Sequence, residues 1–167
     1  MTRRRAGLLL AMAQVALVSS LGLKLMVDRA RLPRAWARTV PYDPSLPIRG
    51  RYVRLALEVP LTRAADDSTG VGERVVRLRS AGGRLEAEAV EGAEGRRVQT
   101  NRTAGGIRVP VLAEPIAFFI PEHVPDPSRR PTGEELWAEV TIPSTGPPRP
   151  IRLGVMRDGR LTPLDLR

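Results

Sequence analysis

The stretch Pro47–Val59, "PIRGRYVRLALEV", predicts the strand around which the rest of the fold is built. Its proline and glycine favour a turn, and apolar residues then occupy every second position from Val53 through Leu55 and Leu57 to Val59. A period of two in hydrophobicity is typical of a β-strand with one buried face. The arginines between the apolar residues are expected on the solvent side.

The composition favours more elements of the same kind. The chain has 167 residues, of which 42% are hydrophobic and only 4% aromatic, so the core must consist mainly of Val, Leu, Ile and Ala. Its 16 prolines and 15 glycines fit short strands and turns better than a helical bundle. We therefore expect a mainly β fold, a small antiparallel sandwich or barrel-like sheet, preceded by one N-terminal transmembrane helix.

Charge and cysteine content exclude several classes of function. The formal net charge is +9, and the acidic residues, which begin at Asp28, are interleaved with arginines. The densest basic stretches, 74–80 and 93–99, contain no aromatic residue, so we expect no nucleic-acid partner. The absence of cysteine excludes disulfides, thiolate metal sites and a cysteine nucleophile.

The N-terminus has the pattern of a signal anchor. Residues 6–23 carry no charge, and a helix of this length spans about 27 Å, close to the hydrocarbon thickness of a bilayer. Arg3–Arg5 precede the run, which predicts a cytoplasmic tail at 1–5 and a transmembrane segment at 6–27. Lys24 and Arg29 follow the run, so basic residues flank both of its ends, and the orientation is predicted from the shortness of the N-terminal tail.

Two alternatives to an uncleaved anchor remain open at this stage. A signal peptide would be cut at a site between small residues, and Val18-Ser19-Ser20 and Ser20-Leu21-Gly22 are acceptable sites. A buried helix of a soluble protein would also be apolar.

Beyond the anchor the chain is divided into a linker and a β-rich domain. Residues 28–47 are rich in proline and are expected to form a juxtamembrane linker, with an edge strand near Trp36–Val40. Residues 48–167 are expected to form the extracytoplasmic β-rich domain, with seven or eight strands. A short helical turn is expected at Thr132–Leu136, where Thr132 would cap and Glu135 would be its partner.

Two hairpins have clear turn signals. The first covers residues 74–90 and turns at Ala81-Gly82-Gly83, with arginines on one strand opposite glutamates on the other. The second turns at Asp158-Gly159. Between them, Gly106–Ile120 is expected to form one or two strands broken near Glu114-Pro115, and Leu136–Ile142 another.

Two short motifs resemble the GDYXXLXY family of bacterial membrane-anchored proteins. Gly50, Tyr52 and Leu55 match the pattern Gly-Asp-Tyr-x-x-Leu-x-Tyr, whereas Arg51 replaces the aspartate and Leu57 the second tyrosine. The segment "FFIPE", residues 118–122, is similar to an aromatic-Phe-Val-Pro-Glu element of the same family.

The resemblance implies an N-terminal helix in the bacterial inner membrane and a β domain in the periplasm or outside the cell. It implies an accessory role beside multispanning membrane proteins and no established activity, so we expect an interaction module, not an enzyme, with no cofactor and no metal. The arginine at position 51 replaces an acceptor or cation ligand with a cation. The candidate interaction residues are Gly50, Arg51, Tyr52, Leu55, Phe119, Pro121 and Glu122.

An envelope hydrolase is the alternative hypothesis. His123 is the only histidine, and Glu122 or Asp126 would orient it as a general base for a nucleophile such as Ser128 or Thr132. No Gly-x-Ser-x-Gly elbow surrounds these hydroxyls. Asp66, Asp67 and Glu73 could hold a hard cation weakly, but they lie in a loop, where acidic residues are common without binding a metal.

Overall fold

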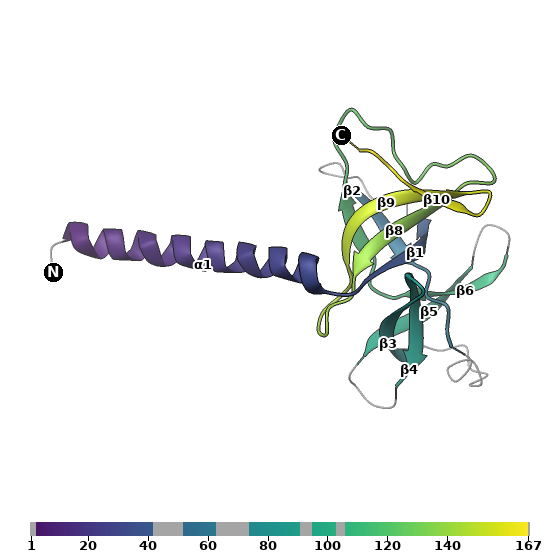
Figure 1. The fold of residues 1–167 in the computed structure, drawn as a ribbon, viewed down its shortest axis with the longest axis horizontal. Coiled ribbons are helices and arrows are strands. Elements are labelled where there is room, and N and C mark those ends of the chain that lie inside the picture. The colour runs from purple at the N-terminus through teal and green to yellow at the C-terminus, as the bar shows by residue number, and fades with distance from the viewer. Residues whose placement is uncertain (1–2, 42–51, 63–73, 91–94, 103–105, 167) are drawn as a thin grey trace. The chain divides into compact units, whose positions relative to one another are not determined.

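A computed structural model of the chain describes residues 3–41, 52–62, 74–90, 95–102 and 106–166. The chain forms two compact units, Met1–Leu32 and Pro33–Arg167, which are described separately (Figure 1). The boundary after Leu32 means that the β-rich unit begins earlier than the expected residue 48.

The first unit is a single helix, α1, at Arg3–Arg31. Its part Ala6–Arg31 is long and apolar enough to cross a membrane, and its most apolar window is not buried at all. Ser20 lies within the apolar run and donates its hydroxyl to the carbonyl of Leu17 at 2.8 Å. The polar group is therefore satisfied inside the helix, as an apolar environment requires.

The second unit is a single sheet of ten strands, in the order β10-β9-β8-β1-β4-β3-β5-β6, with β2 paired to β1 and β7 paired to β2. The strands are β1 Arg34–Pro41, β2 Tyr52–Leu57, β3 Arg74–Ala81, β4 Arg84–Ala89, β5 Arg96–Arg102, β6 Arg108–Leu112, β7 Ile116–Phe119, β8 Glu135–Thr141, β9 Arg149–Arg157 and β10 Arg160–Pro163. The expected mainly β, barrel-like fold is confirmed, with more strands than the expected seven or eight.

Strand β1 lies in the interior of the sheet, which corrects the expected edge strand in a linker. It pairs with β8 on one side and with β4 and β2 on the other. Its buried face consists of Ala35, Ala37 and Thr39, which are small or polar. The sequence therefore carries little hydrophobic signal there, and the pairing on both sides decides that the strand lies inside the sheet.

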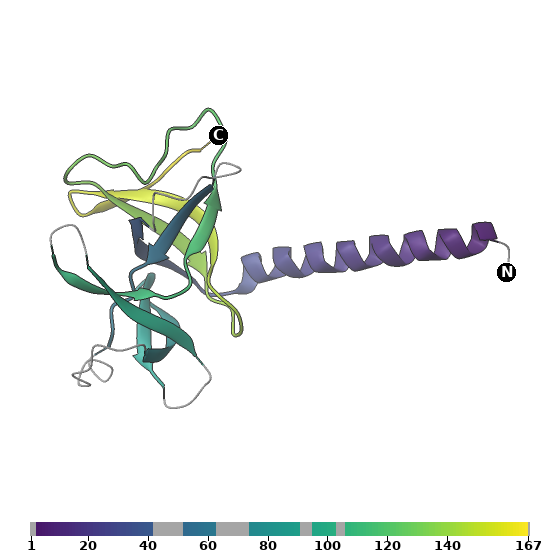
Figure 2. The same cartoon turned by 180° about the vertical axis from the view of Figure 1, so that it is seen from behind.

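The sheet curls into two lobes that meet at β1 (Figures 1 and 2). In one lobe, β4, β3, β5 and β6 are closed into a ring by residues 58–62. The amide of Val59 donates to the carbonyl of Pro110 at 2.9 Å, and that of Thr62 to Ala87 at 3.0 Å. The other lobe contains β10, β9, β8, β1, β2 and β7, and Cα atoms of β7 approach within 8 Å of β9.

One core cluster extends through both lobes. Its fully buried side chains include Leu55 and Leu57 of β2, Leu85 of β4 and Leu153 of β9. The opposite face of β2 is also covered, because Ala56 packs with residues of β6 in a second small cluster. The opening strand is thus buried on both faces at its centre, not on one face as its alternating pattern predicts.

The two predicted hairpin turns are confirmed. Gly82 and Gly83 have φ angles of 56° and 77°, and Asp158 and Gly159 have 50° and 76°. Two successive positive φ angles define the turn that matches the twist of antiparallel strands. The expected pairing across the first hairpin is present between Arg79 and Glu86, at 3.1 Å.

The helical turn expected at Thr132–Leu136 is wrong. Gly133 has a φ of 92°, which an α-helix cannot contain, and the amide of Glu134 donates to the carbonyl of Pro131 in a tight turn. Strand β8 then begins at Glu135. The positive φ of Gly133 prevents a helix there, and the residues that follow pair with β9 instead.

Candidate functional site

The sheet brings the two family-like motifs together. Strands β2 and β7 are antiparallel, and their register places Tyr52 opposite Phe119 and Val53 opposite Phe118. Phe119 is 71% exposed, Tyr52 is half-buried, and Phe118 packs against the core. Tyr52 and Phe119 therefore form a partly exposed aromatic pair, here called the Tyr52–Phe119 patch.

The remaining candidate residues divide into surface and core. Leu55 is fully buried, so its role is in packing and it is not accessible to a partner. Pro121 is half-buried and Glu122 is exposed, directly after β7. Gly50 and Arg51 lie outside the described residues.

Strand β7 lies at an edge of the hydrogen-bonded sheet. It pairs with β2 on one side, and within the described ranges no strand forms a ladder on its other side. An edge strand with an exposed phenylalanine is a feature that proteins usually avoid unless something covers it.

The residues of the hydrolase hypothesis do not form a site. His123 and Glu122 are exposed in a turn. The carboxylate of Asp126 accepts hydrogen bonds from the amide and hydroxyl of Ser128, at 2.9 Å and 2.7 Å. Asp126 therefore shapes the loop through Ser128, and the hydrolase stays a hypothesis with no geometric argument behind it.

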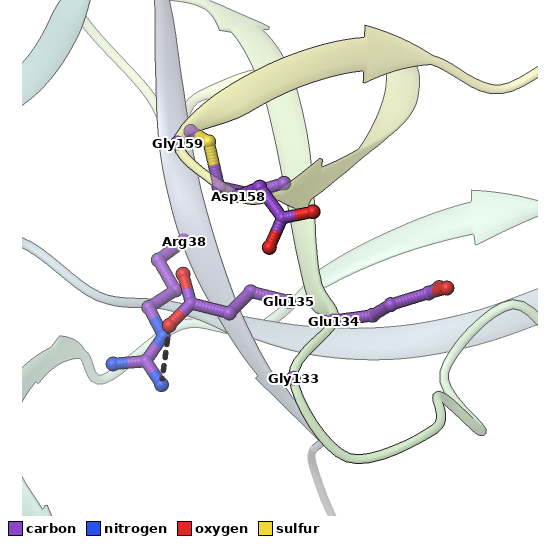
Figure 3. A pocket seen from close by; sticks show the side chains of 7 residues that line it. Arg38, Gly133, Glu134, Glu135, Asp158 and Gly159 are labelled. Carbon is purple, nitrogen blue, oxygen red and sulfur yellow. Dashed lines mark ion pairs between the residues drawn. The ribbon is translucent and has the colours of Figure 1, made fainter.

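Sequence reasoning missed a cluster of charged residues where β8 begins. A pocket of about 370 Å³ is lined by Arg38, Gly133, Glu134, Glu135, Met156, Asp158 and Gly159 (Figure 3). Arg38 pairs with Glu135 at 3.1 Å and with Glu58 at 3.5 Å. The indole Nε1 of Trp137 donates to Glu135 at 3.2 Å, so both carboxylate oxygens of Glu135 have partners.

Glu134 points away from Glu135 and binds different cations (Figure 3). Arg157 donates a hydrogen bond to it, and Arg130 lies 3.6 Å away. The hydrogen bond from Arg157 is the main cause that lowers the pKa of Glu134, partial burial opposes it, and the charges of Arg157 and Arg130 add to the lowering. This glutamate thereby ties the loop before β8 to β9.

The cluster is better explained as structural than as catalytic. Glu134 and Glu135 are each neutralised by arginine, and the described part of the chain contains no group of three residues placed to hold a metal ion. A second pocket of about 690 Å³, which also includes Glu134, is lined by Arg130, Arg157 and Arg160 among others. No spacing in the sequence marks the members of the cluster as neighbours, because they come from four separate segments of the chain: Arg38, Glu58, residues 130–135 and Arg157.

The outer face of β1, β8 and β9 carries both tryptophans. The guanidinium of Arg152 lies 5.4 Å from the ring centre of Trp36, and that of Arg84 lies 5.3 Å from that of Trp137. Arg152 also donates to Glu139 at 2.6 Å. Trp36 is half-buried on this face.

Comparison of the chain with protein-family models, curated proteins and solved structures gave no match. The resemblance to the GDYXXLXY family therefore stays a prediction that rests on the motif residues alone.

Proposed function

We propose that the protein is a single-pass protein of the bacterial inner membrane whose β domain is an interaction module in the periplasm or outside the cell. The observation that carries the proposal is the exposed apolar surface of α1. Twelve large apolar side chains between Leu8 and Val27 are at least 37% exposed. Burying each of them fully would stabilise the protein by about 1.5–3 kcal/mol, and a bilayer would supply that environment.

The continuity of α1 supports an anchor that is not removed. Both candidate cleavage sites, at 18–20 and 20–22, lie inside the helix, which runs on without a break to Arg31. A signal peptide has a shorter apolar core and an accessible cleavage site. Arg3–Arg5, which precede the apolar run, favour an N-terminus in the cytoplasm.

The Tyr52–Phe119 patch is the surface that we propose for a protein partner. It lies at the end of β2 and β7 that is remote from Pro33, since β2 runs antiparallel to β1 and Tyr52 lies beyond the last paired residue of β1. About ten strand positions separate the levels of Arg34 and Tyr52, or roughly 30 Å along the sheet. That separation favours the extramembrane part of a multispanning membrane protein as the partner.

Fractionation of the native cell tests the anchor and the topology. We expect the full-length protein in the membrane fraction after an alkaline wash, and the β domain degraded when protease is added to spheroplasts. A Leu10→Arg, Leu17→Arg variant should be lost from the membrane, whereas Leu161→Arg, a change of the same kind in β10, should not. A cytoplasmic, soluble wild-type protein would refute the proposal.

Photo-crosslinking tests the partner surface. A photoreactive amino acid at Phe119 should give a discrete crosslinked product in intact cells. The same residue at Arg160, which is exposed on a different strand, should not. Equal labelling from both positions would argue against the Tyr52–Phe119 patch.

A further inference from the structure

We propose that the end of the β domain next to Pro33 binds the headgroups of anionic lipids through an arginine rim. The rim consists of Arg34, Arg84, Arg149 and Arg152, with Trp36 among them. The proposal rests on the proposed function, because it requires α1 to lie in a bilayer.

The sheet gathers the rim from three distant segments of the chain. Arg34 at the start of β1 and Arg149 at the start of β9 are both register partners of Thr141, at the end of β8. In the next outward-facing row, Trp36 is opposite Glu139, and Glu139 is opposite Arg152. Arg84 is the partner of Trp36 on β4, so it joins the same row.

The turn between β3 and β4 also lies at this end. The amide of Trp36 donates to the carbonyl of Gly83 at 2.8 Å, and the hydroxyl of Ser80 donates to the carbonyl of Arg34 at 2.8 Å. The start of β1 is thereby held beside the start of β4. Backbone hydrogen bonds of the sheet therefore hold the rim residues of β1 and β4 next to each other.

Positive charge dominates the described residues of the rim. Glu139 is the acidic residue in its two rows, and it is 7% exposed and bound by Arg152. The connection from Ile142 to Pro148 carries no charge. Arg84 and Arg152 are exposed, and their guanidinium groups lie over the rings of Trp137 and Trp36. Arg152 donates its Nε to Glu139, so its Nη groups, together with the guanidinium of Arg84, are the donors proposed for a phosphate.

Chain connectivity limits how far the rim can lie from the membrane. Arg31 ends α1 and Arg34 begins β1. The four helical residues 28–31 add about 6 Å beyond the transmembrane segment 6–27, and the three residues from Arg31 to Arg34 span at most about 11 Å. The rim therefore lies within about 17 Å of the end of that segment, roughly twice the Debye length of about 8 Å at physiological ionic strength. An anionic bilayer surface would therefore attract the rim, and a tryptophan at that depth is favourable.

Intrinsic fluorescence offers a direct test, because both tryptophans of the chain, Trp36 and Trp137, lie in the β domain. The full-length protein is placed in nanodiscs of phosphatidylcholine alone or with phosphatidylglycerol, with a dansyl acceptor on a lipid headgroup. We expect energy transfer from tryptophan to dansyl to rise when phosphatidylglycerol is present. High salt should abolish the rise.

Charge reversal locates the effect. Arg34→Glu with Arg149→Glu should lose the rise that depends on phosphatidylglycerol, and Arg34→Gln with Arg149→Gln should lose part of it. Arg129→Glu with Arg160→Glu, the same change of charge in the loop before β8 and at the start of β10, should keep it. Transfer that is equal in both lipids, or lost equally in the control, would overturn the lipid site.

The two proposals fail in different ways. Protein that an alkaline wash removes from both kinds of bilayer would refute the membrane anchor. Protein that stays in both bilayers but shows no lipid-dependent transfer would refute the arginine rim alone.

Discussion

The ring of Trp36 on β1 lies where a side chain at Gly154 on β9 would begin. A Cβ atom at position 154 would come 2.9 Å from Cζ3 of Trp36 and 3.1 Å from the carbonyl oxygen of Thr162. The two strands are separated by β8, so the indole reaches across one strand to lie over the glycine. This contact fixes the position of a tryptophan that belongs to the arginine rim.

Gly154→Ala should therefore destabilise the β domain by about 1–3 kcal/mol, since neither a backbone carbonyl nor a packed indole can move freely. Urea unfolding of the detergent-solubilised protein, followed by circular dichroism, measures the effect. In a Trp36→Leu background the same substitution should cost less. An equal cost in both backgrounds would mean that the indole is not the obstacle.

Leu55 and Phe119 are both among the candidate interaction residues, but their substitution by alanine should affect stability very differently. Leu55→Ala removes a fully buried side chain and should cost about 2–5 kcal/mol of stability. Phe119→Ala removes an exposed side chain and should change stability by no more than about 0.5 kcal/mol. Only Phe119→Ala should weaken crosslinking to a partner without a loss of folded protein. Unfolding and crosslinking experiments on both variants measure the two effects.

The pairing of Glu134 with Arg157 predicts a dependence of stability on pH. The hydrogen bond from Arg157 lowers the pKa of Glu134 in the folded protein below its ordinary value of 4.5. A lowered folded-state pKa contributes stability above the ordinary value, and that contribution is lost as the pH falls through the folded-state pKa. Glu134→Gln should lower Tm at neutral pH, and the difference from wild type should shrink below about pH 4.5.

Glu122→Gln is the matched control, because Glu122 is an exposed carboxylate in the loop after β7. It removes the same charge without touching Arg157. A difference between wild type and Glu134→Gln that stays constant from neutral to acid pH would show that the ion pair is not its source.

The N-terminus of the mature protein should be intact. A continuous helix through residues 18–22 predicts that native protein extracted from membranes retains residues 1–31. Peptide mapping by mass spectrometry should recover peptides from residues 6–31. A product that begins after Ser20 or Gly22 would instead identify a cleaved signal peptide.

The sequence alone was sufficient for the elements whose signals are local. The uncharged run from Ala6 to Leu23 predicts α1, the alternation in Val53–Val59 predicts β2, and paired turn residues predict both hairpins. Each of these features depends on neighbours in the chain. Hydrophobic periodicity and the turn residues that tolerate positive φ angles identify them without knowledge of the fold.

Only the tertiary structure decided which distant residues meet. Strand β1 is interior because it pairs with β8, β4 and β2, although its small inward-facing residues carry little hydrophobic signal. Tyr52 meets Phe119, and the arginine rim gathers around Trp36, through the register of strands far apart in sequence. Register is fixed by the combined burial of many side chains across the sheet, so no single stretch of sequence contains it.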